Sequence, residues 1–161
     1  MVPEIRRILY ATDLSKNALH AFSYAVEFAR RLGAMIVVLH VIEPASVTFG
    51  EQVKKMAEDR EYESTIREIT QRWQRFSESV DPELGCIGHI ANVLVRVGQP
   101  VEEILNVAEQ ENCDMFVLGN HGKRVLKQAL LGSVCREVLD RALKPVVIIP
   151  LAGDGFEWDA S

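Results

Sequence analysis

The spacing of apolar residues changes in a regular alternation along this chain, and that alternation constrains the fold more than any other feature. Short apolar runs have the length and composition of buried strands, and they stand at residues 8–11, 35–42, 93–97, 115–118 and 146–149. Gly98 follows the third run, and Pro145 precedes the last. The pattern predicts short strands that are covered on both faces.

Between these runs, apolar residues recur at steps of three and four, as they do on one face of a helix. The stripes are Ala18, Phe22, Ala25, Ala29 and Leu32; Val101, Ile104, Leu105 and Ala108; and Cys135, Val138, Leu139 and Ala142. Gly33 suits the end of the first helix and Pro100 the first turn of the second. Strands that alternate with helices predict βαβ units, so we expect a five-stranded, doubly wound parallel α/β domain.

A charged segment at 51–79 separates the second and third expected strands. Its second half is predicted to form an amphipathic helix that packs on the sheet, with the stripe Tyr62, Ile66, Ile69, Trp73, Phe76 and Val80. At 161 residues the chain suits one domain. We expect this domain to span 1–152, followed by an acidic tail at 153–161.

Composition excludes several kinds of protein. The formal charge of −5 and pI near 5.4 argue against a general nucleic-acid or anionic-membrane binder. The three cysteines, Cys86, Cys113 and Cys135, are too widely spaced for a CxxC site and predict buried, reduced thiols. No signal-peptide pattern or membrane-length apolar stretch is seen, so we expect a cytoplasmic protein. The four histidines are dispersed and the cysteines form no pair, so we expect no dedicated metal site.

A glycine motif directly follows the run at 115–118. It reads Gly119-x-x-Gly122, then nine residues, then Gly132-Ser133. Glycines after a buried strand let the backbone approach a ligand, and a Gly-Ser pair that opens a helix presents N–H groups and a hydroxyl to an anion. The Walker A motif does not fit, because Val117 stands where its first glycine is needed and Arg124 follows Lys123. The dinucleotide fingerprint should follow the first strand, which runs into Thr12-Asp13-Leu14-Ser15 instead.

Together, these residues resemble the universal stress protein family, in its ATP-binding branch. The resemblance also rests on Leu39-His40-Val41, on Gly98-Gln99-Pro100-Val101-Glu102-Glu103-Ile104 and on Lys144-Pro145-Val146-Val147-Ile148-Ile149-Pro150. It implies a Rossmann-like fold, similar to the adenine nucleotide alpha hydrolases, with strand order 3-2-1-4-5. Ligands bind in such sheets where neighbouring crossovers diverge, here beside the first and fourth strands.

The resemblance implies an adenine nucleotide (ATP, ADP or AMP), with Mg²⁺ or Mn²⁺ bridging the phosphates, and a set of residues to hold it. Those residues are Ala11, Thr12, Asp13, Val41, Leu118, Gly119, Asn120, His121, Gly122, Gly132, Ser133 and Val134. Other interpretations stay open at this point. Asp13 can be a turn or cap carboxylate, His121 a solvent-exposed residue, the glycines two ordinary turns, and Lys123, Arg124 and Lys127 a solvated basic turn. His40 reads as a core or cleft-edge histidine.

The sequence leaves three functions open. The first is a nucleotide-dependent regulatory protein that an unknown protein partner reads; the second is a slow ATPase or another ATP-using enzyme; the third is a nucleotide-free dimeric adaptor. No residue is assigned a catalytic role, because neither Asp13 nor His121 has a visible group to orient it. The family also implies a homodimer through the last strand, at Val146, Val147, Ile148 and Ile149.

Overall fold

The structure is a computed structural model that describes residues 1–12, 16–43, 86–120 and 131–150, together with Arg60, 63–64, 67–68, Gln71 and Arg75. Its elements are β1 (Arg7–Thr12), α1 (Lys16–Leu32), β2 (Met35–Ile42), the short 3₁₀ helix η2 (Cys86–His89), β3 (Ile90–Val97), α3 (Pro100–Gln110), β4 (Met115–Gly119), α4 (Ser133–Arg141) and β5 (Val146–Ile149). The alternation of strands and helices expected from the sequence is confirmed.

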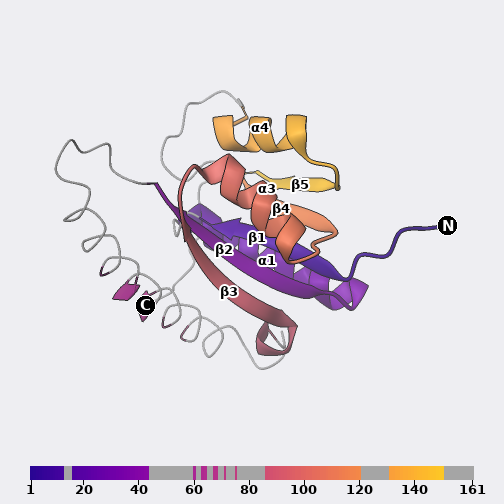
Figure 1. Cartoon of the computed structure of the whole chain (residues 1–161). Helices are drawn as coiled ribbons and strands as arrows, with labels where there is room; N and C mark the ends of the chain where they lie inside the picture. Colours follow the sequence, from indigo (N-terminus) through magenta and orange to yellow (C-terminus); the bar gives the residue numbers. More distant parts are fainter. Residues whose placement is uncertain are drawn as a thin grey trace.

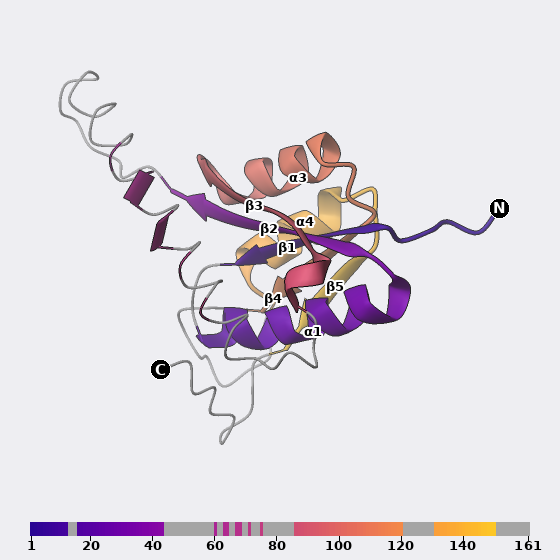
Figure 2. The same ribbon diagram turned by 90° about the horizontal axis from the view of Figure 1, so that it is seen from below.

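The five strands form one parallel sheet in the order β3-β2-β1-β4-β5. Helix α1 covers one face of this sheet, while α3 and α4 cover the other (Figures 1 and 2). Side chains therefore alternate along β1: Ile8 and Tyr10 pack in the cluster under α1, and Leu9 packs in the cluster under α3 and α4. Both faces of the central strands are buried, which explains their unbroken apolar runs.

Most of the expected helix stripes are buried, but two leucines are not. Leu32 is 48% exposed and Leu139 is 44% exposed, although both lie in the helices that their spacing predicted. Leu32 is the last residue of α1, directly before Gly33 at φ +65°, where the chain leaves the helix. Leu139 lies about 100° around α4 from the buried Val138, at the edge of the packed face.

The expected helix between 51 and 79 falls largely outside the described residues, and its whole apolar stripe does so. The described positions within it, from Arg60 to Arg75, are helical and exposed. The expected tail at 153–161 also lies outside the described residues. The third strand begins at Ile90, three residues before the first valine of the sequence pattern.

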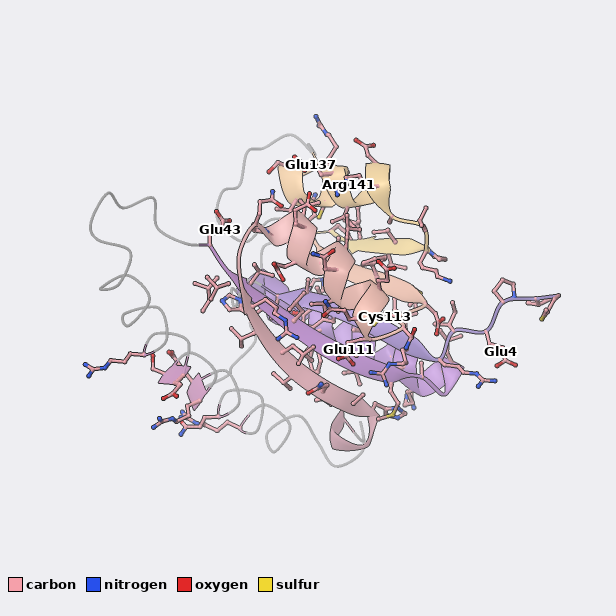
Figure 3. The ribbon with its side chains drawn as sticks, viewed as in Figure 1. Glu4, Glu43, Glu111, Cys113, Glu137 and Arg141 are labelled. Atoms are coloured by element: carbon pink, nitrogen blue, oxygen red, sulfur yellow. The ribbon has the colours of Figure 1, made fainter. Side chains whose placement is uncertain are left out.

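Asp114, in the turn before β4, forms hydrogen bonds at the end of the sheet opposite the glycine motif. Its Oδ2 atom accepts the backbone N–H groups of Arg6 and Arg7, at 2.9 and 3.0 Å. Arg7 also pairs with Glu111 at 2.8 Å, and Figure 3 shows Glu111 and Cys113 at the opposite end of the sheet from Glu43. One carboxylate thus anchors the start of β1 to the turn between α3 and β4.

Asp114→Ala is expected to lower the free energy of unfolding by about 2–3 kcal/mol, because two backbone donors lose a charged acceptor at once. Urea denaturation followed by circular dichroism measures the change. Asp140→Ala is the matched control, because Asp140 is exposed on α4, and we expect a change within about 0.5 kcal/mol. Equal effects of the two substitutions would contradict the anchoring role.

Candidate functional site

The carboxyl ends of β1 and β4 separate at the point where the glycine motif begins. The two strands pair from Ile8↔Met115 to Ala11↔Leu118, and no pairing continues beyond that register in the described residues. The crossover after β1 leads through α1 to β2, whereas the one after β4 leads through α4 to β5. This is the topological switch point at which open α/β sheets bind ligands.

On the β2 side, a histidine holds the last residue of β1. Thr12 and His40 are register partners, and His40 Nδ1 lies 2.8 Å from the backbone oxygen of Thr12. A carbonyl oxygen can only accept, so Nδ1 carries the proton and donates. The interpretation of His40 as a histidine with a satisfied hydrogen bond is confirmed.

On the β5 side, the strand pairing of β4 continues one residue past its end. The N–H of Asn120 donates to the carbonyl of Ile149 at 2.9 Å, so Asn120 follows β5 while Thr12 is held towards β2. The divergence of the two strands is therefore fixed by hydrogen bonds on both sides. Thr12 and Asn120 are thus bonded towards different neighbouring strands, β2 and β5.

Helix α4 begins beside the end of β4, and its N-terminus differs from that of α3. In α3, the Gln99 side chain accepts the N–H of Glu102 at 2.9 Å, and two glutamates occupy the first turn. In α4, the N-cap is Gly132 in an extended conformation, no side-chain cap bond is made within the described chain, and the first turn has no acid. The first N–H groups of a helix need partners; in α3 a side chain supplies one of them, whereas in α4 no side chain of the described residues does.

Two side chains tie the start of α4 to the end of β4. Asn120 Oδ1 accepts the N–H of Gly132 at 3.1 Å, and the Cys135 thiol lies 3.4 Å from the carbonyl of Gly119, to which it donates. At its far end, α4 is tied to α3 by the ion pair of Arg141 with Glu102. The Arg141 guanidinium lowers the pKa of the Glu102 carboxyl.

Two of the three cysteines, Cys113 and Cys135, are free and buried, as the sequence predicted for them; the side chain of Cys86 lies outside the described part of the structure. Burial raises the pKa of each thiol from an ordinary value of 9.0 to about 11. Cys135 is therefore a neutral thiol near pH 7, and it adds no negative charge beside the N-terminus of α4. Its hydrogen bond makes it part of the packing beneath Gly119.

The structure brings most of the described candidate residues to the carboxyl end of the sheet. Ala11 and Thr12 end β1, Leu118 and Gly119 end β4, and Asn120 follows directly. Gly132 is buried, Ser133 is exposed and Val134 is half-buried at the start of α4. Val41 lies next to His40 on β2 and packs against the cluster under α3 and α4. Asp13, His121 and Gly122 lie outside the described residues, as do Lys123, Arg124 and Lys127.

Sequence reasoning named Asn120 only among the residues expected to hold the nucleotide, and it missed the bond of this side chain to Gly132. Asn120 and Gly132 are twelve positions apart, and no periodic pattern joins them. The only signal was an Asn directly after the first glycine of the motif, a residue type whose short amide bonds readily to nearby backbone. The bond of the Cys135 thiol to the carbonyl of Gly119 was also not foreseen, since the sequence predicted only that this thiol is buried.

The chemistry of this end of the sheet is suited to an anion. Backbone N–H groups at a helix N-terminus and an exposed hydroxyl bind phosphate without a lysine or a metal ion. Among the described residues, no group of three or more His, Cys, Asp and Glu side chains could hold a metal. No helix in the described part of the chain has the length and hydropathy of a membrane span.

Comparisons with known proteins agree on one family. The model of the universal stress protein family matches residues 4–150. The chain is 30% identical over 154 residues to universal stress protein MJ0577 of Methanocaldococcus jannaschii, covering 89% of this chain and 94% of that protein. The solved structure of MJ0577 superposes with a TM-score of 0.66 at 31% identity, over 94% of this chain and all of the other.

Two further solved structures have the same architecture. Universal stress protein UspA from Lactobacillus plantarum superposes with a TM-score of 0.71 at 25% identity, covering 92% of this chain and 99% of the other. A universal stress protein in complex with cAMP superposes with a TM-score of 0.58 at 21% identity, covering 92% and 98%. The likeness to the cAMP complex shows the fold alone.

Proposed function

Because this chain belongs to the universal stress protein family, we propose that it binds ATP at the switch point between β1 and β4 and acts as a nucleotide-dependent regulatory protein. The observation that carries this proposal is the start of α4. Its N-terminus has no side-chain cap from the described residues and no acid in its first turn, and it opens with Gly132-Ser133 beside the diverging strand ends. A phosphate would supply the missing acceptors.

The nucleoside half of the ligand is proposed to lie on the β1 and β2 side. There, Ala11 and Thr12 end β1, and Val41 offers backbone donor and acceptor groups to an adenine edge. Asp13, which follows Thr12 in the sequence, would accept hydrogen bonds from the ribose hydroxyls. The phosphates would then run from Leu118-Gly119-Asn120, past His121 and Gly122, to Ser133 and Val134.

A divalent cation would accompany the phosphates rather than occupy a protein site of its own. Mg²⁺ keeps several of its waters and is commonly bound through substrate phosphates. The proposed output of binding is the arrangement of the cleft loops, which a protein partner in the cytoplasm would read.

The experiment that tests the proposal is a calorimetric titration of nucleotide-stripped protein with ATP, AMP and adenosine, each with Mg²⁺. We expect affinity to rise from adenosine to ATP, since each phosphate adds contacts with the start of α4. Gly122→Val, which adds a branched side chain to the glycine motif, should abolish ATP binding in a protein that remains folded. A related fold has been solved with cAMP, so cAMP is the competing ligand to include. No saturable binding of ATP would overturn the proposal.

We also propose that the protein is a homodimer through β5. This strand is at one edge of the sheet, and Val146, Val147 and Ile148 are only half-buried in the single chain. Exposed apolar edge strands are usually covered in native proteins. A second copy that pairs with β5 would supply that cover.

Val147→Asp is expected to shift the protein from dimer to monomer, because it places a charge in the middle of this edge. Sedimentation velocity at micromolar protein concentration measures the shift. Val93→Asp on β3, the strand at the other edge, is the matched control. A Val147→Asp protein that sediments as a dimer would contradict the assigned interface.

A further inference from the structure

The side chain of Asn120 connects the first part of the glycine motif, at Gly119, to the second part, at Gly132. Asn120 lies directly after Gly119, and its side chain reaches Gly132, which precedes α4, at 3.1 Å. The backbone N–H of Gly132 can only donate, so the facing atom of Asn120 must be its carbonyl oxygen. A single side chain therefore bridges the loop that begins after β4 and ends at α4.

This bridge is anchored on the sheet side as well. The N–H of Asn120 donates to Ile149 on β5, so the backbone of Asn120 is fixed to the sheet while its side chain holds the helix. Gly132 is buried and Asn120 is half-buried, which limits the access of water to the bond between them. A hydrogen bond sheltered from water is stronger than one at an exposed turn, so it holds the two groups in place more firmly.

We propose that Asn120 is a positioning residue for the phosphate site: its side chain sets the start of α4 against the end of β4, and it occupies the N–H of Gly132. The phosphates then meet the N–H groups of Ser133 and Val134, not that of Gly132. This inference rests on the proposed nucleotide binding at the same edge. It assigns the side chain of Asn120 a role that the sequence motif alone does not give it.

The first part of the test needs no ligand. Amide hydrogen exchange of Gly132 is measured by NMR in the nucleotide-free protein. Asn120→Ala should raise the exchange rate of Gly132 about tenfold, the effect of losing about 1.4 kcal/mol of protection. Asn120→Asp keeps a side-chain oxygen at the same position and should restore the wild-type rate. Asn92→Ala is the matched control. Asn92 also accepts a backbone N–H, that of Val93 at 3.0 Å, but it lies at an exposed position of β3.

The second part separates positioning from general stability. Asn120→Ala should weaken ATP about tenfold and leave adenosine within twofold, because only the phosphates depend on the start of α4. Unchanged exchange at Gly132, or equal losses for ATP and adenosine, would overturn the proposal. Wild-type protein that binds no ATP would overturn the proposed function, while the exchange rates still decide whether Asn120 positions α4. If Asn120→Ala does not fold, Asn120→Ser carries the same comparison with a shorter side chain.

Discussion

Ser133→Asp is expected to lower the affinity for ATP about a hundredfold while leaving the protein as stable as the wild type, or slightly more stable. Ser133 is the first residue of α4 and is exposed. A carboxylate there interacts favourably with the helix N-terminus, by about 0.3–1 kcal/mol. The same carboxylate repels a phosphate at about 5 Å by about 3 kcal/mol per charge pair at an effective dielectric constant of 20. Opposite effects on stability and binding are the signature of an anion site.

Calorimetric titration with ATP and adenosine, with thermal unfolding in parallel, measures both effects. Adenosine affinity should stay within twofold of wild type, because it carries no phosphate. Ser133→Asn is the matched control of similar size without charge, and it should cost less than about tenfold in ATP affinity, the loss of one hydrogen bond. If ATP binds Ser133→Asp as tightly as wild type, the phosphates do not lie at the start of α4.

Phe22→Ala is expected to lower the free energy of unfolding by about 3–5 kcal/mol. Phe22 is fully buried in α1, and its ring lies 5.2 Å from that of Tyr10 on β1. Truncation removes buried apolar surface, leaves a cavity between helix and sheet, and breaks the ring contact. A loss of this size is a large share of the stability of a domain this small.

Urea denaturation monitored by circular dichroism measures this loss, and Tyr24→Ala is the matched control. Tyr24 is also an aromatic residue of α1, but it is 46% exposed, and its ring contacts the ring of His20. We expect its removal to cost less than about 1 kcal/mol. Comparable losses for the two variants would show that the face of α1 is wrongly assigned.

The sequence predicted the fold well where burial controls the pattern. Met35 to Ile42 was expected as one strand and forms β2 with those bounds, because a strand covered on both faces must be apolar throughout. The pattern did not predict which stripe residues lie at the margin of a packed face. Leu32 and Leu139 follow helical spacing but lie beyond or beside the packed surface, and spacing carries no information about where the neighbouring layer stops.

The candidate site was only partly predictable. The glycines and Ser133 could be singled out as candidates because special backbone and hydroxyl chemistry is visible in residue types and their spacing. The bonds of Asn120 to Gly132 and of Cys135 to Gly119 could not be found, because they depend on how α4 is placed on the sheet. Asp13, His121 and Gly122 keep the roles that the family resemblance implies as predictions, since they lie outside the described residues.

The most direct test of the central claim is an amide NMR titration of ¹⁵N-labelled protein with ATP and Mg²⁺. The claim predicts that the largest saturable shifts fall at Gly119, Ser133 and Val134, at the carboxyl edge of the sheet. The amides of Arg7 and Asp114, at the opposite edge, should remain within the error of the measurement. Saturable shifts confined to that opposite edge, or no shifts at millimolar ATP, would contradict nucleotide binding at the switch point.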